Sequence, residues 1–170
     1  YMSKKGHIVK LILPNTGYKK NLLKYYNIKY KFKIKRIKNF NKFPIGINYY
    51  LYSIWAILKS NLNNQDLYLT RNFFTSFILN ILNKEHILEI HDDIKIEGRI
   101  VRFLVKHVKI LNLKYLIKIV TTTKTLKQKY ISYGVTKKKI FVLHNASSLP
   151  SKFDKSRIKK NYKIGYFGSI

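Results

Sequence analysis

Short runs of β-branched and apolar residues alternate with helix-like stretches along almost the whole chain. Strands are predicted in the runs HIVKLIL, YKFKIKRI, DLYLT, HILEI, YLIKIVT and KIFVLH, which begin at residues 7, 30, 66, 86, 115 and 139. Helices are predicted at residues 47–62, 73–83, 98–111 and 123–134. Strands that alternate with helices at this spacing indicate an α/β fold, with a Rossmann-like, mostly parallel sheet flanked by helices.

The composition fits one folded domain that carries a large positive charge. The chain has 170 residues, of which 46% are hydrophobic, and 35 Lys and Arg against 7 Asp and Glu give a net charge of +28. Lys far outnumbers Arg and is spread evenly, as expected for drift toward residues with AT-rich codons. An anionic surface such as a membrane is the alternative, and specific nucleic-acid binding is not expected because base-specific readers rely on Arg.

Two further features of the composition narrow the possibilities. The chain has no cysteine, which excludes disulfides and thiolate metal sites. Its longest apolar stretch, residues 47–58, is about half of the roughly 20 residues that a membrane-spanning helix needs.

Polar residues follow several of the predicted strands. In open parallel sheets, ligands bind at the carboxyl ends of the strands. The residues just past the strands are Asn15, Thr70–Asn72, His91–Asp93, Thr121–Thr123 and His144–Asn145. We expect Arg71, His91, Thr122 and Asn145 to lie on one edge of the sheet.

The carboxylates of this basic chain are concentrated around one of these strand ends. Five of the seven acids lie within thirteen residues, beside His86 and His91: Glu85, Glu89, Asp92, Asp93 and Glu97. Purely structural roles remain open for these acids and for Arg71. Asp92 and Asp93 can cap a helix, Glu85 and Glu97 can be surface charges, and Arg71 can form an ion pair with an acid. For the other candidates, Thr121–Thr123 suit a strand end and helix cap, and Asn145 suits a turn. No metal is expected, because His86 and His91 would face opposite sides of an extended strand.

Five weak motifs occur in an order that resembles a known family. In chain order, the motifs are GHIVKLI, DLYLTRN, ILEIHDD, the stretch from IVTTTKTLKQKY to FVLHNAS, and KIGYFGSI. Together they are similar to the N-terminal domain of GT-B glycosyltransferases, in particular glycosyltransferase family 4. The resemblance implies a Rossmann-like acceptor-side domain at residues 1–150. It further implies that residues 151–170 form a linker and the first strand of a C-terminal donor domain, so that both ends look cut and the chain alone is inactive.

The resemblance also implies roles for individual residues. His91 and Glu89 would be the catalytic pair at the cleft between the two domains. The substrate-binding residues would be Arg71, Asp92, Asp93, Thr122, Asn145 and Gly168. The family motif NGvD appears here as NASS at residues 145–148, so the hinge at Asn145 departs from the pattern.

On this resemblance the expected function is a retaining glycosyltransferase of polysaccharide biosynthesis, which transfers a sugar from a nucleotide-sugar co-substrate to a glycan or lipid-linked acceptor. Neither a metal nor another cofactor is expected, and the expected location is cytoplasmic, at the inner membrane face. Two alternatives remain. One is a non-catalytic α/β module that binds an anionic ligand or nucleic acid, and the other is a metal phosphohydrolase that uses His91 and Asp92.

Overall fold

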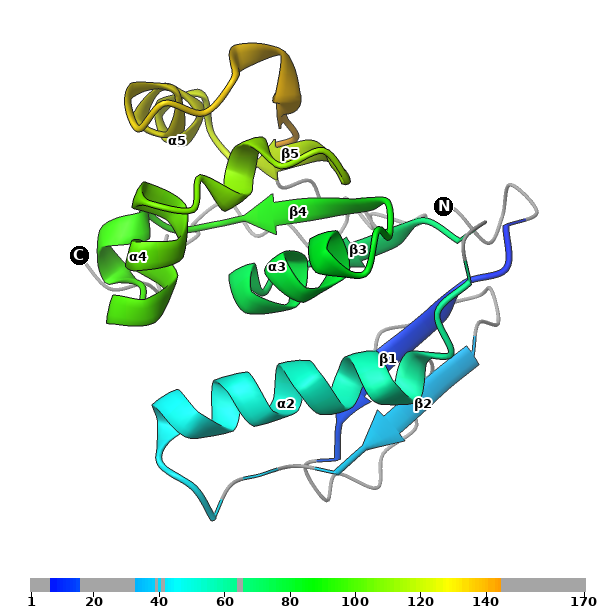
Figure 1. Cartoon of the computed structure of the whole chain (residues 1–170). Coiled ribbons are helices and arrows are strands. Elements are labelled where there is room, and N and C mark those ends of the chain that lie inside the picture. The colour runs from blue at the N-terminus through cyan, green and yellow to red at the C-terminus, as the bar shows by residue number, and fades with distance from the viewer. Residues whose placement is uncertain (1–6, 16–32, 39, 41, 64–65, 145–170) are drawn as a thin grey trace, which may run out of the picture.

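Parallel strands and helices alternate along the chain, as the sequence predicts. The computed structural model describes residues 7–15, 33–38, 40, 42–63 and 66–144. The smaller of its two sheets pairs β1 (Lys10–Pro14) with β2 (Lys33–Ile37). The larger has the order β3 (Tyr68–Thr70), β4 (His86–Ile90), β5 (Leu116–Thr121) and β6 (Ile140–Val142). All pairings are parallel, so the Rossmann-like α/β class is confirmed, with the strands divided between two sheets (Figure 1).

Within the described residues, four α-helices and three short 3-10 turns connect these strands. The helices are α2 (Ile45–Ser60), α3 (Phe73–Ile81), α4 (Arg99–Lys106) and α5 (Lys124–Ser132), and the turns are η2 (Ile94–Ile96), η3 (Ile110–Asn112) and η4 (Lys137–Lys139). The single helix predicted at residues 98–111 is wrong. It ends at Lys106, because Lys109 adopts a left-handed φ of 53° that a helix cannot continue through. The chain then enters the core through η3, where Ile110 is buried.

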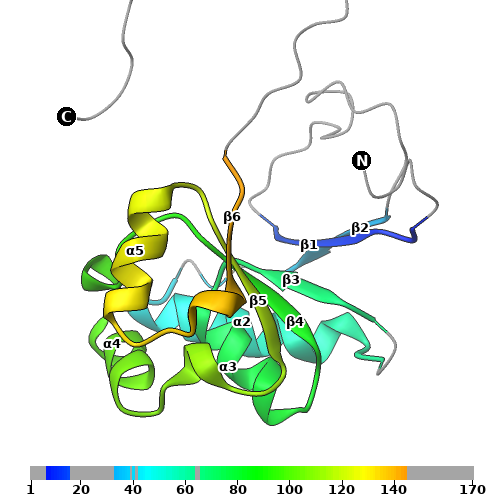
Figure 2. The ribbon, with the colours of Figure 1, turned by 90° about the horizontal axis from the view of Figure 1, so that it is seen from above.

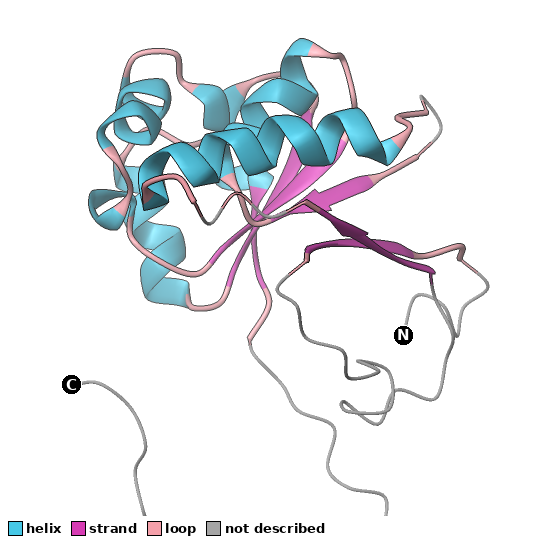
Figure 3. Cartoon of the chain, turned by 90° about the horizontal axis from the view of Figure 1, so that it is seen from below, coloured by secondary structure: helices cyan, strands magenta, loops and turns pink. Residues whose placement is uncertain are grey.

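The helices gather on one side of the strands (Figure 3). In the larger sheet the strand order follows the chain, so successive right-handed crossovers place their helices on the same face. Burial in β4 follows the period of two: His86, Leu88 and Ile90 are buried, whereas Ile87 and Glu89 are only partly so. The core therefore lies between the sheet and the helical layer.

Helix α2 contacts both the smaller sheet and α3. The Nζ atom of Lys10 donates a hydrogen bond to the Ser60 carbonyl over 3.1 Å, and Lys35 bonds to the Lys59 carbonyl, so β1 and β2 each supply a cation to the negative end of the helix. On its other side, Tyr50 meets Phe74 of α3 edge to face, with ring centroids 4.8 Å apart. Figure 2 shows the small sheet lying beside β3.

The linker and the first donor-domain strand that were expected at residues 151–170 lie outside the described residues. Among the helices that the structure describes, none combines the length and the apolar character needed to cross a membrane.

Candidate functional site

The carboxyl ends of β3 and β4 meet at a small polar pocket. Its volume is about 50 Å³. It is lined by Arg71, Phe73, Glu89, Ile90, His91, Asp92 and Glu97. By the same kind of measure one water needs about 10–15 Å³, so the pocket has room for a few hydroxyl-sized groups. Arg71 and His91 thus lie on the same edge, as predicted.

Glu89 and His91 form the closest polar pair in this pocket. Their Oε1 and Nε2 atoms are 2.6 Å apart, and the side chains are 29% and 25% exposed, respectively. The two residues are separated by two positions, so the alternation of an extended chain places them on the same face. The bond fixes the imidazole and leaves Nδ1, which has no hydrogen-bond partner among the described residues, as the ring atom available to a ligand.

Glu97 joins the same pocket, so its interpretation as a surface charge is wrong. Burial raises the pKa of its carboxyl, and the nearby Asp92 carboxylate raises it further. The 3-10 turn η2 folds the chain back over the end of β4 and brings Glu97 toward Asp92. The sequence offered no distinct signal for this turn, since Asp93 was expected to precede a helix. Glu85, by contrast, is exposed as expected.

The β3–α3 turn forms the other wall of the pocket and is held from two directions. Asn72 caps α3 by accepting a hydrogen bond from the Thr75 amide at 2.8 Å. The Tyr49 hydroxyl of α2 accepts a bond from the Phe73 amide at 3.0 Å. Arg71 is exposed on this turn and forms no ion pair with another described residue, so the predicted bridge to an acid is not present there.

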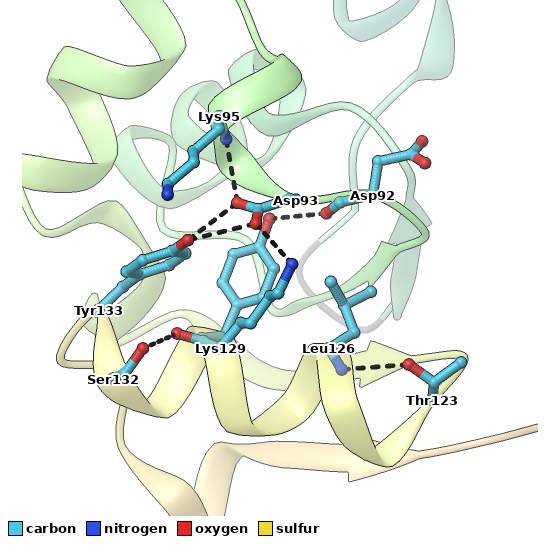
Figure 4. Close-up of polar contacts among 9 residues, drawn as sticks. Asp92, Asp93, Lys95, Thr123, Leu126, Lys129, Ser132 and Tyr133 are labelled. Atoms are coloured by element: carbon cyan, nitrogen blue, oxygen red, sulfur yellow. Dashed lines mark hydrogen bonds and ion pairs between the residues drawn. The ribbon is translucent and has the colours of Figure 1, made fainter.

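Asp93 faces away from the pocket and toward α5 (Figure 4). Its carboxylate accepts hydrogen bonds from the Lys95 amide and the Tyr133 hydroxyl, and it pairs with Lys129 Nζ at 3.1 Å. These contacts, the Lys95 amide above all, lower the pKa of the Asp93 carboxyl. Asp93 therefore caps η2, which was one of its two predicted roles, and its oxygens are already engaged.

Asp92 behaves differently from its neighbour. Its backbone carbonyl accepts a hydrogen bond from the buried Tyr130 hydroxyl at 3.1 Å, while its carboxylate points away from that cluster (Figure 4). The backbone of Asp92 is thus fixed by α5, and its side chain lines the pocket.

The remaining candidates that the structure describes do not line this pocket. Thr121 is buried at the end of β5, and the Thr123 hydroxyl caps α5 by accepting a bond from the Leu126 amide at 3.1 Å, so the predicted strand end and helix cap are confirmed. Thr122, between them, is not among the residues that line the pocket. Asn145 and Gly168 lie outside the described residues.

His86 is separated from the pocket by the sheet. It is fully buried against α3, where Ser76 Oγ lies 2.8 Å from Nε2, whereas His91 lies beyond the strand. Within the part of the chain that the structure describes, no three His, Asp or Glu side chains converge as a metal ion would require.

Comparison of the chain with protein-family models, with curated proteins and with solved structures finds no match in any of the three.

Proposed function

We propose that this chain is the acceptor-side part of a retaining glycosyltransferase, which moves a sugar from a nucleotide-sugar donor to a glycan or lipid-linked acceptor. The observation that carries the proposal is the Glu89–His91 pair, in a carboxylate-lined pocket at the carboxyl edge of a parallel sheet. This edge is where ligands bind in folds of this class. The order of the five sequence motifs supports the same function.

The charges of the pocket favour a ligand that is rich in hydroxyl groups. Three carboxylates, those of Glu89, Asp92 and Glu97, line it together with the cations or potential cations Arg71 and His91. Ionised carboxylates only accept hydrogen bonds, and a sugar hydroxyl supplies the donor that they need. An anionic ligand would meet repulsion here, although the chain as a whole is strongly basic. The alternative of a module that binds an anion is therefore less well supported.

The reaction assigns a place to each group. The acceptor hydroxyl gives up its proton and its oxygen forms a bond to the anomeric carbon, while the bond from that carbon to the donor phosphate breaks and the phosphate leaves with the electron pair. Asp92 and Glu97 bind and orient the acceptor hydroxyl. Glu89 accepts a hydrogen bond from His91 Nε2, so Nδ1 of the neutral ring carries a lone pair and takes up the proton of the acceptor hydroxyl as a general base.

The test uses the full-length protein with the donor-side domain that the resemblance implies. Release of nucleoside diphosphate is measured with a panel of nucleotide sugars and glycan or lipid-linked acceptors. His91→Ala is expected to lower turnover about 10²-fold or more, and Glu89→Ala by a smaller factor, because the ring remains but loses the partner that orients it.

Glu85→Ala is the matched control, because Glu85 is an exposed acid just before the same strand. It should leave turnover unchanged. Equal, small effects of His91→Ala and Glu85→Ala would contradict the proposal. Metal-dependent hydrolysis of phosphate esters without an acceptor would favour the phosphohydrolase instead.

A further inference from the structure

Helix α4 leaves two large apolar side chains in contact with solvent. Ile100 is 52% exposed and Phe103 is 57% exposed, although the same helix buries Val101, Leu104 and Val105. One turn before the helix, Ile96 is 76% exposed. Ile100 and Phe103 are three residues apart on α4, so their side chains share one side of the helix. Ile96 lies on η2 and is separated from α4 by two extended residues.

Cations surround these apolar side chains. At the helical period, the three buried residues occupy one side of α4, and five residues share the other side. These five, which with Ile96 we call the α4 face, are Arg99, Ile100, Arg102, Phe103 and Lys106. The sequence has no acid from Gly98 to Lys118, so no carboxylate of this segment offsets the cations.

The arginines of the α4 face are not explained by compositional drift. Drift accounts for the abundance of Lys, but the chain has few Arg residues, and two of them, Arg99 and Arg102, lie on this eight-residue helix. Guanidinium groups bind phosphate through paired donors, which makes Arg the better residue for a phosphate-bearing surface.

The position of α4 relates its exposed face to the pocket. The helix begins two residues after Glu97, and it lies beyond the carboxyl end of β4 (Figure 1). A planar surface that contacted the α4 face would therefore lie at the same edge of the sheet as the Glu89–His91 pair.

We propose that the α4 face docks on an anionic lipid bilayer. Phe103, Ile100 and Ile96 would enter the boundary between head groups and acyl chains, while Arg99, Arg102 and Lys106 would bind lipid phosphates. The net charge of +28 attracts the chain to such a surface from a distance. This inference rests on α4 and is independent of the proposed transfer reaction.

Vesicle flotation tests the proposal with the full chain. The vesicles contain phosphatidylcholine and phosphatidylglycerol in equal parts, with phosphatidylcholine alone as the neutral comparison. The double variants Ile100→Ser/Phe103→Ser and Arg99→Glu/Arg102→Glu are each expected to weaken binding to the anionic vesicles about tenfold or more. Circular dichroism checks that both variants remain folded, as expected for exposed positions.

Two matched control variants distinguish binding by the α4 face from binding through the overall positive charge or through any exposed apolar pair. Ile54→Ser/Leu58→Ser removes an exposed apolar pair from α2, where the side chains are 44% and 65% exposed. Lys137→Glu/Lys138→Glu makes the same charge change on the exposed turn η4. Both controls should bind anionic vesicles nearly as well as the parent. Losses equal to those of the α4 variants would overturn the proposal.

A fluorescent probe measures insertion directly. The chain has one tryptophan, so Phe103→Trp in a Trp55→Phe background places a single indole on the α4 face. Its emission should shift to the blue with anionic vesicles and stay unchanged with neutral ones. Floating protein without any shift would overturn the proposal. Binding to single-stranded RNA without binding to vesicles would also overturn the proposal, provided that Arg99→Glu/Arg102→Glu lost this RNA binding and Ile100→Ser/Phe103→Ser kept it. That pattern would assign the face to nucleic acid.

Discussion

At the scale of single residues, His86 is fully buried between β4 and α3, with both ring nitrogens bonded. Nδ1 lies 2.9 Å from the Lys84 carbonyl, which can only accept, so Nδ1 carries the proton. Nε2 is then the acceptor for the Ser76 hydroxyl. Burial lowers the pKa of this imidazole, the bond to the Lys84 carbonyl opposes part of that shift, and the nearby Lys139 adds a smaller lowering.

This burial predicts a pH dependence of stability. The folded pKa of His86 lies below the ordinary value of 6.5, so the unfolded chain binds more protons between the two values. The free energy of unfolding is highest above the ordinary pKa, decreases as the pH falls below that value, and levels off below the folded pKa. Urea unfolding at pH of about 7.5, 6.5 and 5.5 should show this decrease, and His86→Gln should reduce the slope over the acidic step.

The exposed His107 provides the control for this measurement. His107→Gln should keep the full slope of the parent protein. If His86→Gln and the parent lost the same free energy of unfolding between the two lower pH values, burial of the neutral ring would not explain the pH dependence.

At the scale of elements, α5 positions the loop that follows β4, although the two are far apart in the sequence. The Tyr130 hydroxyl reaches the Asp92 carbonyl across a separation of 38 residues, and Lys129 and Tyr133 hold the Asp93 carboxylate. Tyr130 is itself part of the core. The packing of α5 is thus transmitted to the backbone beside His91.

Removing the buried hydroxyl should loosen that loop. Tyr130→Phe keeps the ring in the core but removes the donor to the Asp92 carbonyl, so it should lower the free energy of unfolding by about 1 kcal/mol. Amide hydrogen exchange in residues 91–95 should become faster. Tyr133→Phe should have the smaller effect on both measurements, because Asp93 retains the Lys95 amide and Lys129. Unchanged exchange in Tyr130→Phe would show that the loop is held by other contacts.

At the scale of the whole molecule, positive charge greatly exceeds negative charge. Among the described residues, Asp93–Lys129 is the one ion pair between an acid and a Lys or Arg, and Glu89 is hydrogen-bonded to His91, in a chain whose net charge is +28 with His neutral. Repulsion among the remaining cations opposes the compact state, and dissolved salt screens it.

The melting temperature should therefore rise with ionic strength. Sodium chloride at about 0.15 M shortens the screening length to about 8 Å, from about 30 Å at 0.01 M. Thermal unfolding followed by circular dichroism should show the increase, and it should be smaller in Lys137→Glu/Lys138→Glu, which carries less net charge. A melting temperature that stayed constant or fell would indicate that attractive pairs outweigh the repulsion.

Local signals in the sequence determined where most elements begin and end. The structure confirms parallel strands close to the predicted ranges and the helix cap at Thr123. The shared face of Glu89 and His91 also follows from the sequence, because alternation along an extended chain is a property of the backbone itself. These features depend on residues a few positions apart, which is why periodicity and capping preferences reveal them.

Contacts between distant segments decided the rest. Glu97 enters the pocket because a one-turn 3-10 helix folds the chain back over β4. Asp93 faces away from it because Lys129 of α5 and Tyr133, just after α5, bind its carboxylate, while Tyr130 holds the Asp92 carbonyl. The division of the parallel strands into two sheets likewise depends on which edges meet in space. Periodicity carries no information about these contacts between distant segments, because their energies come from burial and hydrogen bonds that form only once the helices have packed on the sheet.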